Sequence, residues 1–382
     1  MWFLQTDILL KILSVCALAC LASYLAAKHG KQALAVRFLA LFDLAVICLV
    51  DWRLGVFYTA YTLVTWGIAG FIRRVKRFRR TLFVICCLLC TAPFFYSRAT
   101  GFLSGLPLGF ALVGIAYNML KAVDAVYYCY YTEEKIPFVI YANYMLFLPV
   151  FTAGPIFRYR DFQQTFLHPD PITLERITES VKRFIRGMFK KLVVQSLAFS
   201  LLTKLAQAGP HWYISLAAII LSYAVIWLDM SGYADIAIAL GGAMGLQVPE
   251  NFNRPLTAPS MTQFWRNWHI TLSSWIREHV FVVLNGKRLT RWQGALVSFF
   301  TMFFMGLWHS FALQGLLDGL FYGTIMGCEA LFGIATVNKR KTKKSVFVLR
   351  CVLTNFLFAL GTLSYTLGMD QVFPLLRGLL RL

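Results

Sequence analysis

The sequence predicts an all-α polytopic membrane protein. Of its 382 residues, 59% are hydrophobic and only 14% are charged, and the mean hydropathy is +0.64. Soluble domains are about 45–50% apolar and about 25% charged. Apolar runs long enough to cross a bilayer recur along the whole chain, and about 10–12 of them are expected to form transmembrane or re-entrant helices. The runs are long and uninterrupted, whereas a transmembrane barrel would show short alternating segments.

The apolar runs give the expected helices in order. The first could pass for a signal peptide, but it is too long, lacks a basic start and is followed by further spans. A basic amphipathic helix at 174–189 suits the membrane interface. The mixed segment 229–284 is expected to hold re-entrant structure, and Pro374 is expected to begin a short basic tail. The expected spans are Leu4–Leu25, Arg37–Val50, Leu54–Ile72, Thr81–Tyr96, Pro107–Tyr131, Phe138–Ala153, Leu192–Ala206, Trp212–Leu228, Trp292–Trp308, Phe311–Phe332 and Ser345–Leu367.

The net charge of +20 lies in blocks between the apolar runs. The blocks are Arg73–Arg80, Lys182–Lys191 and Lys339–Lys344. This is the pattern of positive-inside loops, and no aromatic-basic motif for nucleic acid accompanies it. We therefore expect no nucleic-acid binding, cytoplasmic loops at 73–80 and 339–344, and an outside amino terminus. A single integral domain, 1–382, is the simplest organisation.

The nine cysteines give no sign of a metal site or a disulfide framework. Nearly all of them lie in apolar runs, where a cysteine behaves as a small hydrophobic residue. Cys87 and Cys90 form a CxxC motif inside such a run, and no Cys/His set has the spacing of zinc ligands. We therefore predict no bound metal.

The candidate site lies in the mixed segment and the span after it. His269 and His309 each follow a tryptophan, Trp268 and Trp308, in very apolar sequence. An ionisable residue at membrane depth is costly and suggests function. A single buried histidine is more often a hydrogen-bond partner between helices, and we assign that simpler role to His29, His168, His211 and His279.

A continuous helix over 262–284 would place Trp265, His269, Leu272 and Ser273 along one face. Arg266, Arg277 and Glu278 would then fall elsewhere. A pocket built this way would have indole and aliphatic walls around an imidazole. Two asparagines in the preceding loop, Asn251 and Asn253, could donate hydrogen bonds into it. In the SGYAD sequence, we expect a bend at the glycine and Asp235 near a helix start.

His309 suits general base catalysis. A neutral imidazole can accept a proton from a hydroxyl group and so make the oxygen nucleophilic. The sequence has no GxSxG motif, and no cysteine lies beside either histidine, so a covalent acyl-enzyme has weak support. Direct attack by a bound alcohol on an acyl donor is the simpler mechanism.

Five fragments resemble the membrane-bound O-acyltransferase family over about 144–332. They are AGPIFRYRDF, LDMSGYADIAIALG, PENFNRPL, FWRNWHITLSSWIREHVFVVL and FMGLWHS. Their order and spacing match the bacterial branch, which includes teichoic acid D-alanyltransferases and alginate and cellulose O-acetyltransferases. The resemblance implies that His309 is the catalytic histidine and His269 the second active-site residue. Asn251, Asn253, Trp265, Trp268, Ser273 and Trp308 are then the expected substrate-binding residues.

The resemblance also implies a fold and partners. Helices would surround a thinned core with a central funnel, in a multi-pass protein of the bacterial cytoplasmic membrane. The donor would be a thioester on the phosphopantetheine arm of an acidic acyl-carrier protein, with no cofactor bound to the chain itself. An accessory envelope acyltransferase and an envelope polymer acceptor would be the other partners. Chain length, AGPIFRYRDF and REHVFVVL favour D-alanyl transfer, whereas the LNGKRLTRWQG linker is closer to the polysaccharide acetylases.

Two readings from other classes remain open. A transporter would also place polar residues at the membrane midplane, but no paired broken helices occur in two related halves. A non-catalytic scaffold would not require two histidines of this kind. Acyl transfer and complex assembly, both measured on a variant of His309, would distinguish the three.

Overall fold

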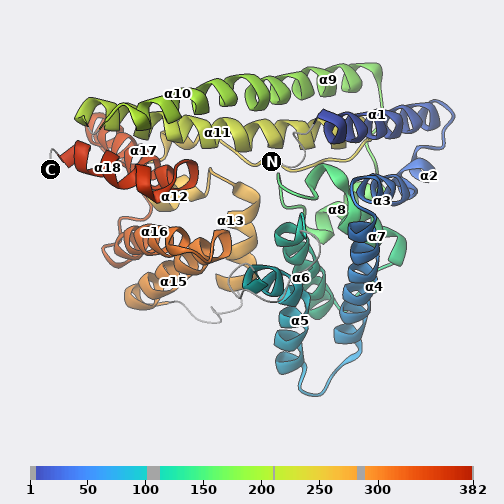
Figure 1. The fold of residues 1–382 in the computed structure, drawn as a ribbon. Helices are drawn as coiled ribbons and strands as arrows, with labels where there is room; N and C mark the ends of the chain where they lie inside the picture. The colour runs from blue at the N-terminus through green and yellow to red at the C-terminus, as the bar shows by residue number, and fades with distance from the viewer. Residues whose placement is uncertain (1–5, 101–111, 210, 282–288, 381–382) are drawn as a thin grey trace. The chain divides into compact units, whose positions relative to one another are not determined.

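A computed structural model describes residues 6–100, 112–209, 211–281 and 289–380 (Figure 1). Within these ranges the chain is helical and holds no strand, apart from one isolated antiparallel bridge between Phe252 and Trp268. The all-α prediction is therefore confirmed. The described residues group into two compact units, Met1–Ile185 with Asp235–Pro249, and Arg186–Ala234 with Glu250–Leu382. The single domain and the 144–332 core stay predictions.

The first unit holds the N-terminal helices and the last part of α11. Its helices are α1 (Thr6–Lys28), α2 (Gln32–Arg37), α3 (Leu39–Val50), α4 (Trp52–Arg74), α5 (Arg79–Thr100), α6 (Ile115–Thr132), α7 (Phe138–Leu146), a 3-10 turn (Leu148–Val150), α8 (Tyr159–Leu167) and α9 (Leu174–Met188), of which the last residues belong to the second unit. The start of the first expected span, and residues 107–111 of the fifth, lie outside the described residues.

The second unit holds the candidate site. Its elements are a π-helical turn (Phe189–Val194), α10 (Gln195–Gln207), most of α11 (Trp212–Ala243), a 3-10 turn (Pro255–Thr257), α12 (Met261–Trp265), α13 (Ile270–Ile276), a second π-helical turn (Arg277–Phe281), α15 (Arg291–His309), α16 (Leu313–Leu331), α17 (Lys344–Thr366) and α18 (Met369–Leu380). Residues 282–288, which include most of the LNGKRL part of the predicted linker, lie outside the described residues.

In the part of the chain that the structure describes, four helices are long and apolar enough to cross a membrane by length and composition, namely α4, α5, α11 and α17. Two shorter apolar helices, Ala17–Lys28 and Leu39–Val50, accompany them. Only 17% of the α5 window is buried, and its exposed residues include Val84, Ile85 and Leu88. A long apolar surface of this kind is stable against lipid and would be unstable in water.

Three expectations about helix ends are wrong. The helix α11 runs unbroken from Trp212 to Ala243, so Gly232 makes no bend and Asp235 lies well inside a helix. The predicted interfacial helix continues through the π-helical turn into α10 without a break. Pro374 lies inside α18 and does not begin a tail. In each case an apolar face continues past the polar residue or proline that suggested an end, so packing overrides the local signal.

The AGPIFRYRDF fragment is anchored to a buried aspartate of α6. The carboxylate of Asp124 accepts a hydrogen bond from the backbone N–H of Tyr159 at 2.6 Å and pairs with Arg158 at 3.3 Å. The hydroxyl of Tyr144 donates to the carbonyl of Phe157 at 3.0 Å. These bonds satisfy backbone groups that could not be left unpaired inside an apolar protein, so this fragment has a structural role in the first unit.

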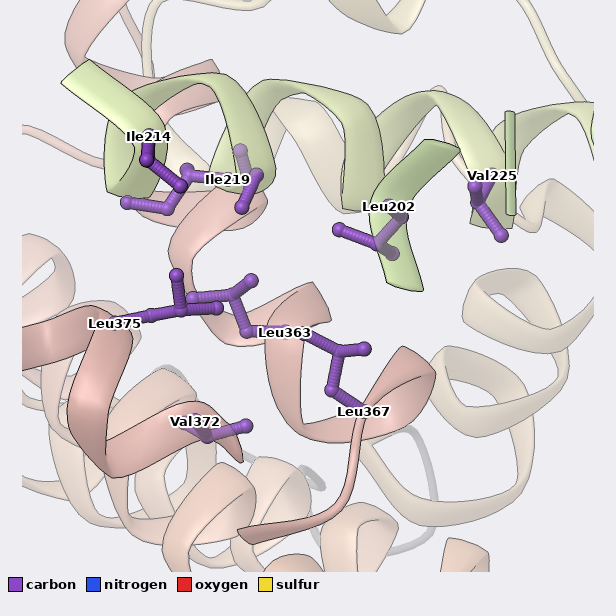
Figure 2. Packing of buried hydrophobic residues seen from close by; sticks show 10 residues of the cluster. Leu202, Ile214, Ile219, Val225, Leu363, Leu367, Val372 and Leu375 are labelled. Atoms are coloured by element: carbon purple, nitrogen blue, oxygen red, sulfur yellow. The ribbon is translucent and has the colours of Figure 1, made fainter. Parts of the chain in front are cut away.

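A hydrophobic core joins α10, α11, α17 and α18 in the second unit (Figure 2). Leu363 and Leu202 are fully buried in it, and Val225 and Val372 are nearly so. Ser222 and Thr362 share a hydrogen bond between α11 and α17. This core fixes α17, which carries the aromatic residues that border the candidate site.

The helices α15 and α16 pack backbone against backbone along a row of glycines (Figure 1). A Cβ on Gly319 would lie 2.6 Å from the carbonyl oxygen of Phe303, and a Cβ on Gly323 would lie 2.8 Å from that of Phe299. A Cβ on Gly306 would meet the Gly315 carbonyl oxygen at 2.4 Å. Small residues allow such close approach between helices in membranes, and this contact positions the C-terminal end of α15, where His309 lies.

Candidate functional site

Two motif segments of the second unit pair with each other. The backbone N–H of Asn253 donates to the carbonyl of Asn267 at 2.9 Å, and that of Ile270 donates to the carbonyl of Asn251 at 2.9 Å. The Asn251 side chain accepts from the Thr271 hydroxyl at 2.8 Å. PENFNRPL therefore acts as the backbone partner of the loop that carries His269.

His269 lies at a break between two short helices. Its φ is 47°, in the left-handed region, and it is the N-cap of α13. The continuous helix expected over 262–284 is therefore wrong, because α12 ends at Trp265 and α13 starts at Ile270. A left-handed backbone is unfavourable for a residue with a side chain and persists only where its surroundings impose it. Here the paired segments impose it.

A carboxylate from α16 holds the start of α12. Glu329 accepts hydrogen bonds from the backbone N–H of Met261 at 2.6 Å and of Thr262 at 2.8 Å, and from the Thr262 hydroxyl at 2.7 Å. Ser260 caps the same helix and donates to the carbonyl of Ala335 at 2.7 Å. The start of the tryptophan-rich segment is thus fixed to α16 and to the residues after it.

Replacing Glu329 by alanine is expected to lower the free energy of unfolding by about 1–3 kcal/mol, because buried N–H groups lose their acceptor. Thermal unfolding of purified protein, followed by tryptophan fluorescence, measures this loss. The matched control is Glu179→Ala, which removes a 67% exposed ion-pair partner of Lys182 and should change little. Equal unfolding temperatures for the two variants would show that Glu329 does not hold α12.

Trp268 lies in an aromatic core. It is 2% exposed, stacks on Phe264 with ring centroids 5.5 Å apart, and contacts Phe358 at 4.7 Å and Phe252 at 5.0 Å. Trp265 packs edge-to-face on Tyr322 at 5.7 Å. Trp268 therefore anchors the loop from behind, while Trp265 is shared between this core and a cavity.

A cavity of about 540 Å³ lies beside the loop, with walls from α12, α13, α15 and α16. Its lining residues are Thr262, Trp265, Arg266, Ser273, Ile276, Arg277, Gly294, Ser298, Thr301, Met302, Met305, Met326, Ala330 and Ala335. Two arginines and several hydroxyl groups in a largely apolar wall suit an amphipathic molecule with a polar or anionic end. Arg266 and Arg277 were not expected here, because an unbroken helix over 262–284 would place them away from the face of His269.

Neither histidine is among the described residues that line this cavity, but each lies within four residues of one that does. Met305 precedes His309 by one helical turn, and the backbone N–H of Ser273 donates to the carbonyl of His269 at 3.0 Å. His269 is 3% exposed. Burial, and then the charge of nearby His309, lower the pKa of His269 from 6.5 to about 3. Its imidazole is therefore neutral at physiological pH and lies close enough to His309 for their charges to interact.

His309 is the last residue of α15 and is partly buried. Its ring centroid lies 4.7 Å from Trp308 and 5.7 Å from Tyr365, both edge-to-face. A histidine at this position can be held by aromatic rings and still be reached by a substrate. Among the described residues no group of three His, Cys, Asp or Glu side chains could hold a metal ion.

The structure distributes the predicted substrate residues unevenly. Trp265 and Ser273 line the cavity, and Trp308 packs on His309. Asn251 is buried and caps α13, while the Asn253 side chain is exposed. Their roles toward substrate stay predictions. Sequence reasoning missed Asp318 of α16, a carboxylate within an apolar run, which is the signal that could have found it.

The sequence profile of the membrane-bound O-acyltransferase family matches residues 29–361. The chain belongs to this family. The match covers most of both units, including the paired loops, the cavity and both histidines.

Relatives within the family carry different names. The chain is 33% identical to a probable alginate O-acetylase of Azotobacter vinelandii over 236 residues, 59% of this chain and 46% of the relative. It is 25% identical to a teichoic acid D-alanyltransferase of Streptococcus thermophilus over 307 residues, 75% of this chain and 73% of that protein. It is 29% identical to a peptidoglycan O-acetyltransferase of Helicobacter pylori over 209 residues, 52% of this chain and 38% of the relative. The chain spans about half the length of the alginate O-acetylases that it matches.

Proposed function

We propose that this chain is a membrane-bound O-acyltransferase of the bacterial cytoplasmic membrane. It moves a short acyl group from a thioester to a hydroxyl group of a cell-envelope polymer. One observation carries the proposal: two histidines, close enough to interact electrostatically, lie in a single compact unit, each within four residues of a residue that lines the cavity. Family membership and the names of the relatives support the reaction class.

The reaction needs one base and one donor to the carbonyl oxygen. His309 takes the proton of the acceptor hydroxyl while the oxygen attacks the thioester carbonyl. The tetrahedral intermediate collapses with cleavage of the carbon–sulfur bond, and the leaving thiolate takes the proton back from the imidazolium. His269 is neutral, so it can donate an N–H to the developing oxyanion without adding a second positive charge beside His309.

The cavity bears on the choice of acyl group. Arg266 and Arg277 line it, and no carboxylate occurs among its described lining residues. The ammonium group of a D-alanyl ester would be repelled there, whereas an acetyl group would not. The higher identity to alginate O-acetylases agrees with acetyl transfer, and the longer match to a D-alanyltransferase agrees with D-alanyl transfer. We therefore propose acetyl as the first candidate and keep D-alanyl as the second.

The donor in this proposal is a thioester on the phosphopantetheine arm of an acidic carrier protein. Basic surface of the chain would speed the encounter. The block Lys182–Lys191 is a weaker candidate for this surface than the sequence suggested, because Arg183 pairs with Asp235 at 2.9 Å and buried Lys191 pairs with Asp229. Arg74, Lys76 and Arg77 are all exposed. An accessory envelope acyltransferase could pass the group on to the polymer.

Reversing the charge of Arg74, Lys76 and Arg77 together to glutamate should raise the KM for the acylated carrier roughly tenfold at low salt. The difference should shrink as ionic strength rises and the Debye length falls to ~8 Å. A matched triple reversal of Lys341, Lys343 and Lys344 tests the other exposed block. Transfer from free acyl-pantetheine should be unchanged in both variants. Equal KM values for carrier in all three proteins would remove this surface from the proposal.

Reconstitution tests the proposed function directly. Purified protein in liposomes would receive acetyl or D-alanyl thioesters, presented on carrier protein or on CoA, with teichoic acid and uronic acid polymers as acceptors. The proposal expects ester label on a polymer and free thiol in equal amounts. If the CoA thioester alone supports full activity, the acyl donor is CoA and no carrier protein is needed. Polymer movement across the bilayer without ester formation would indicate a transporter, and complex assembly with neither activity would indicate a scaffold.

A further inference from the structure

Asp318 is a buried carboxylate with an unusual set of neighbours. It lies in α16 and is 4% exposed. The Ser364 hydroxyl lies 2.8 and 3.0 Å from its two oxygens, and the phenol of the next residue, Tyr365, is near enough to interact with it electrostatically. Among the described residues, no lysine, arginine or histidine forms an ion pair with it. A buried carboxylate without a cation is costly, and within an apolar helix it suggests function.

Tyr365 connects this carboxylate to His309. Asp318 interacts with its phenol and bonds to the adjacent Ser364, while its ring packs on the His309 imidazole with centroids 5.7 Å apart and an interplanar angle of 83°. Ser364 also lies within hydrogen-bond distance of the Gly361 carbonyl oxygen, at 2.8 Å. The segment of α17 that faces the catalytic end of α15 is therefore fixed to α16 by Asp318 and by Gln314, whose side chain donates to the Ser364 carbonyl.

We propose that Asp318 and Tyr365 form a positioning pair for His309, in which the carboxylate fixes the tyrosine and the tyrosine ring orients the imidazole. This inference rests on the proposed role of His309 as general base. Neither residue of the pair needs to touch the substrate.

This arrangement affects both the orientation of the His309 imidazole and the charge near it. A tyrosine ring whose phenol interacts with a fixed carboxylate is held in place, so the imidazole that packs on it keeps one direction relative to the acceptor. Among the described residues, the titratable groups that the structure places near His309 include His269, which is neutral, and the Tyr365 phenol, next to which lies Asp318. When His309 takes a proton during transfer, Asp318 supplies the negative charge that favours the imidazolium.

Two single variants, their double variant and one control variant test the pair. Asp318→Asn keeps the shape but removes the charge, and Tyr365→Phe keeps the ring but removes the hydroxyl. The control is Tyr322→Phe, which removes another buried tyrosine hydroxyl between α16 and α17, bonded to the Phe358 carbonyl at 3.0 Å. Each variant is assayed for kcat and KM. Each is also treated with diethyl pyrocarbonate at a series of pH values, and modification of the His309 peptide is quantified by mass spectrometry.

We expect Asp318→Asn to lower kcat roughly ten- to a hundredfold with little change in KM. The pH at which half of His309 becomes reactive should fall by about one unit, since a nearby negative charge is lost. Tyr365→Phe should lower kcat similarly, and the double variant should be no worse than either single one. Tyr322→Phe should leave both quantities unchanged.

The positioning role is refuted if folded Asp318→Asn keeps the wild-type kcat and the wild-type pH of half-maximal His309 modification. If Asp318→Asn does not fold, the same result for Tyr365→Phe refutes it. In that case a defective His309→Ala leaves the proposed function standing. If His309→Ala is fully active, His309 is not the general base, and the positioning role of Asp318 and Tyr365 is refuted as well. Modification of His309 is measured without any substrate, so the two failures remain distinguishable.

Discussion

Purified His309→Ala is expected to transfer acyl groups about 10²–10⁴-fold more slowly than the wild type, which is the usual loss for a general acid–base group. The residue ends α15 and is partly buried, and alanine is favourable in a helix. The variant should therefore insert and fold normally while the chemical step is lost. Initial rates at saturating donor and acceptor measure the effect.

His211→Ala is the matched control. This histidine is exposed, its imidazole stacks on Tyr213 at 5.5 Å, and it is not among the described residues that line the cavity. We expect its rate to equal that of the wild type. Normal transfer by folded His309→Ala would refute the assignment of His309 as general base, whatever the control shows.

Gly319→Ala is expected to have the largest effect on folding. The added Cβ would lie 2.6 Å from the carbonyl oxygen of Phe303 and 3.0 Å from its Cα. Both are backbone atoms of α15, so no side chain can move aside. We expect a loss of about 3 kcal/mol, the upper end of the range for overpacking, because α15 and α16 must separate. Size-exclusion chromatography and thermal unfolding in detergent detect the loss of monodisperse, stable protein.

Gly67→Ala controls for the substitution itself. An added Cβ at this position of α4 has no atom within 4 Å, and alanine is favoured over glycine in a helix by up to about 1 kcal/mol. This variant should be at least as stable as the wild type. If both variants unfold at the same temperature, the glycine row does not hold α15 against α16.

The helices were predictable because lipid imposes a simple rule on the sequence. A segment such as Trp52–Arg74 must satisfy its backbone internally and stay apolar over its length. The ends were less predictable. The helix α11 continues past Asp229, Gly232 and Asp235, because Arg183 and Lys191 neutralise its acidic residues from another part of the chain. No local pattern contains that information.

The candidate site was also predictable only in part. His269 and His309 were found because imidazoles in apolar sequence are conspicuous. Arg266 and Arg277 were excluded because helical periodicity was extended across 266–269, where the backbone turns left-handed at His269. That turn depends on hydrogen bonds to 251–253. Tyr365 was missed because its contact with His309 joins distant segments, and only the apolar context of Asp318 pointed to this region.

The pairing of residues 251–253 with 267–270 has a consequence for family members that differ in substrate. The bonds that hold His269 in its conformation are made by a neighbouring motif and not by its own. One bond between the segments depends on the residue types on both sides, the bond that the Thr271 hydroxyl donates to the Asn251 side chain. We therefore expect a chimera that exchanges one segment alone to lose this bond where the partner residue differs, and one that exchanges both segments together to keep it.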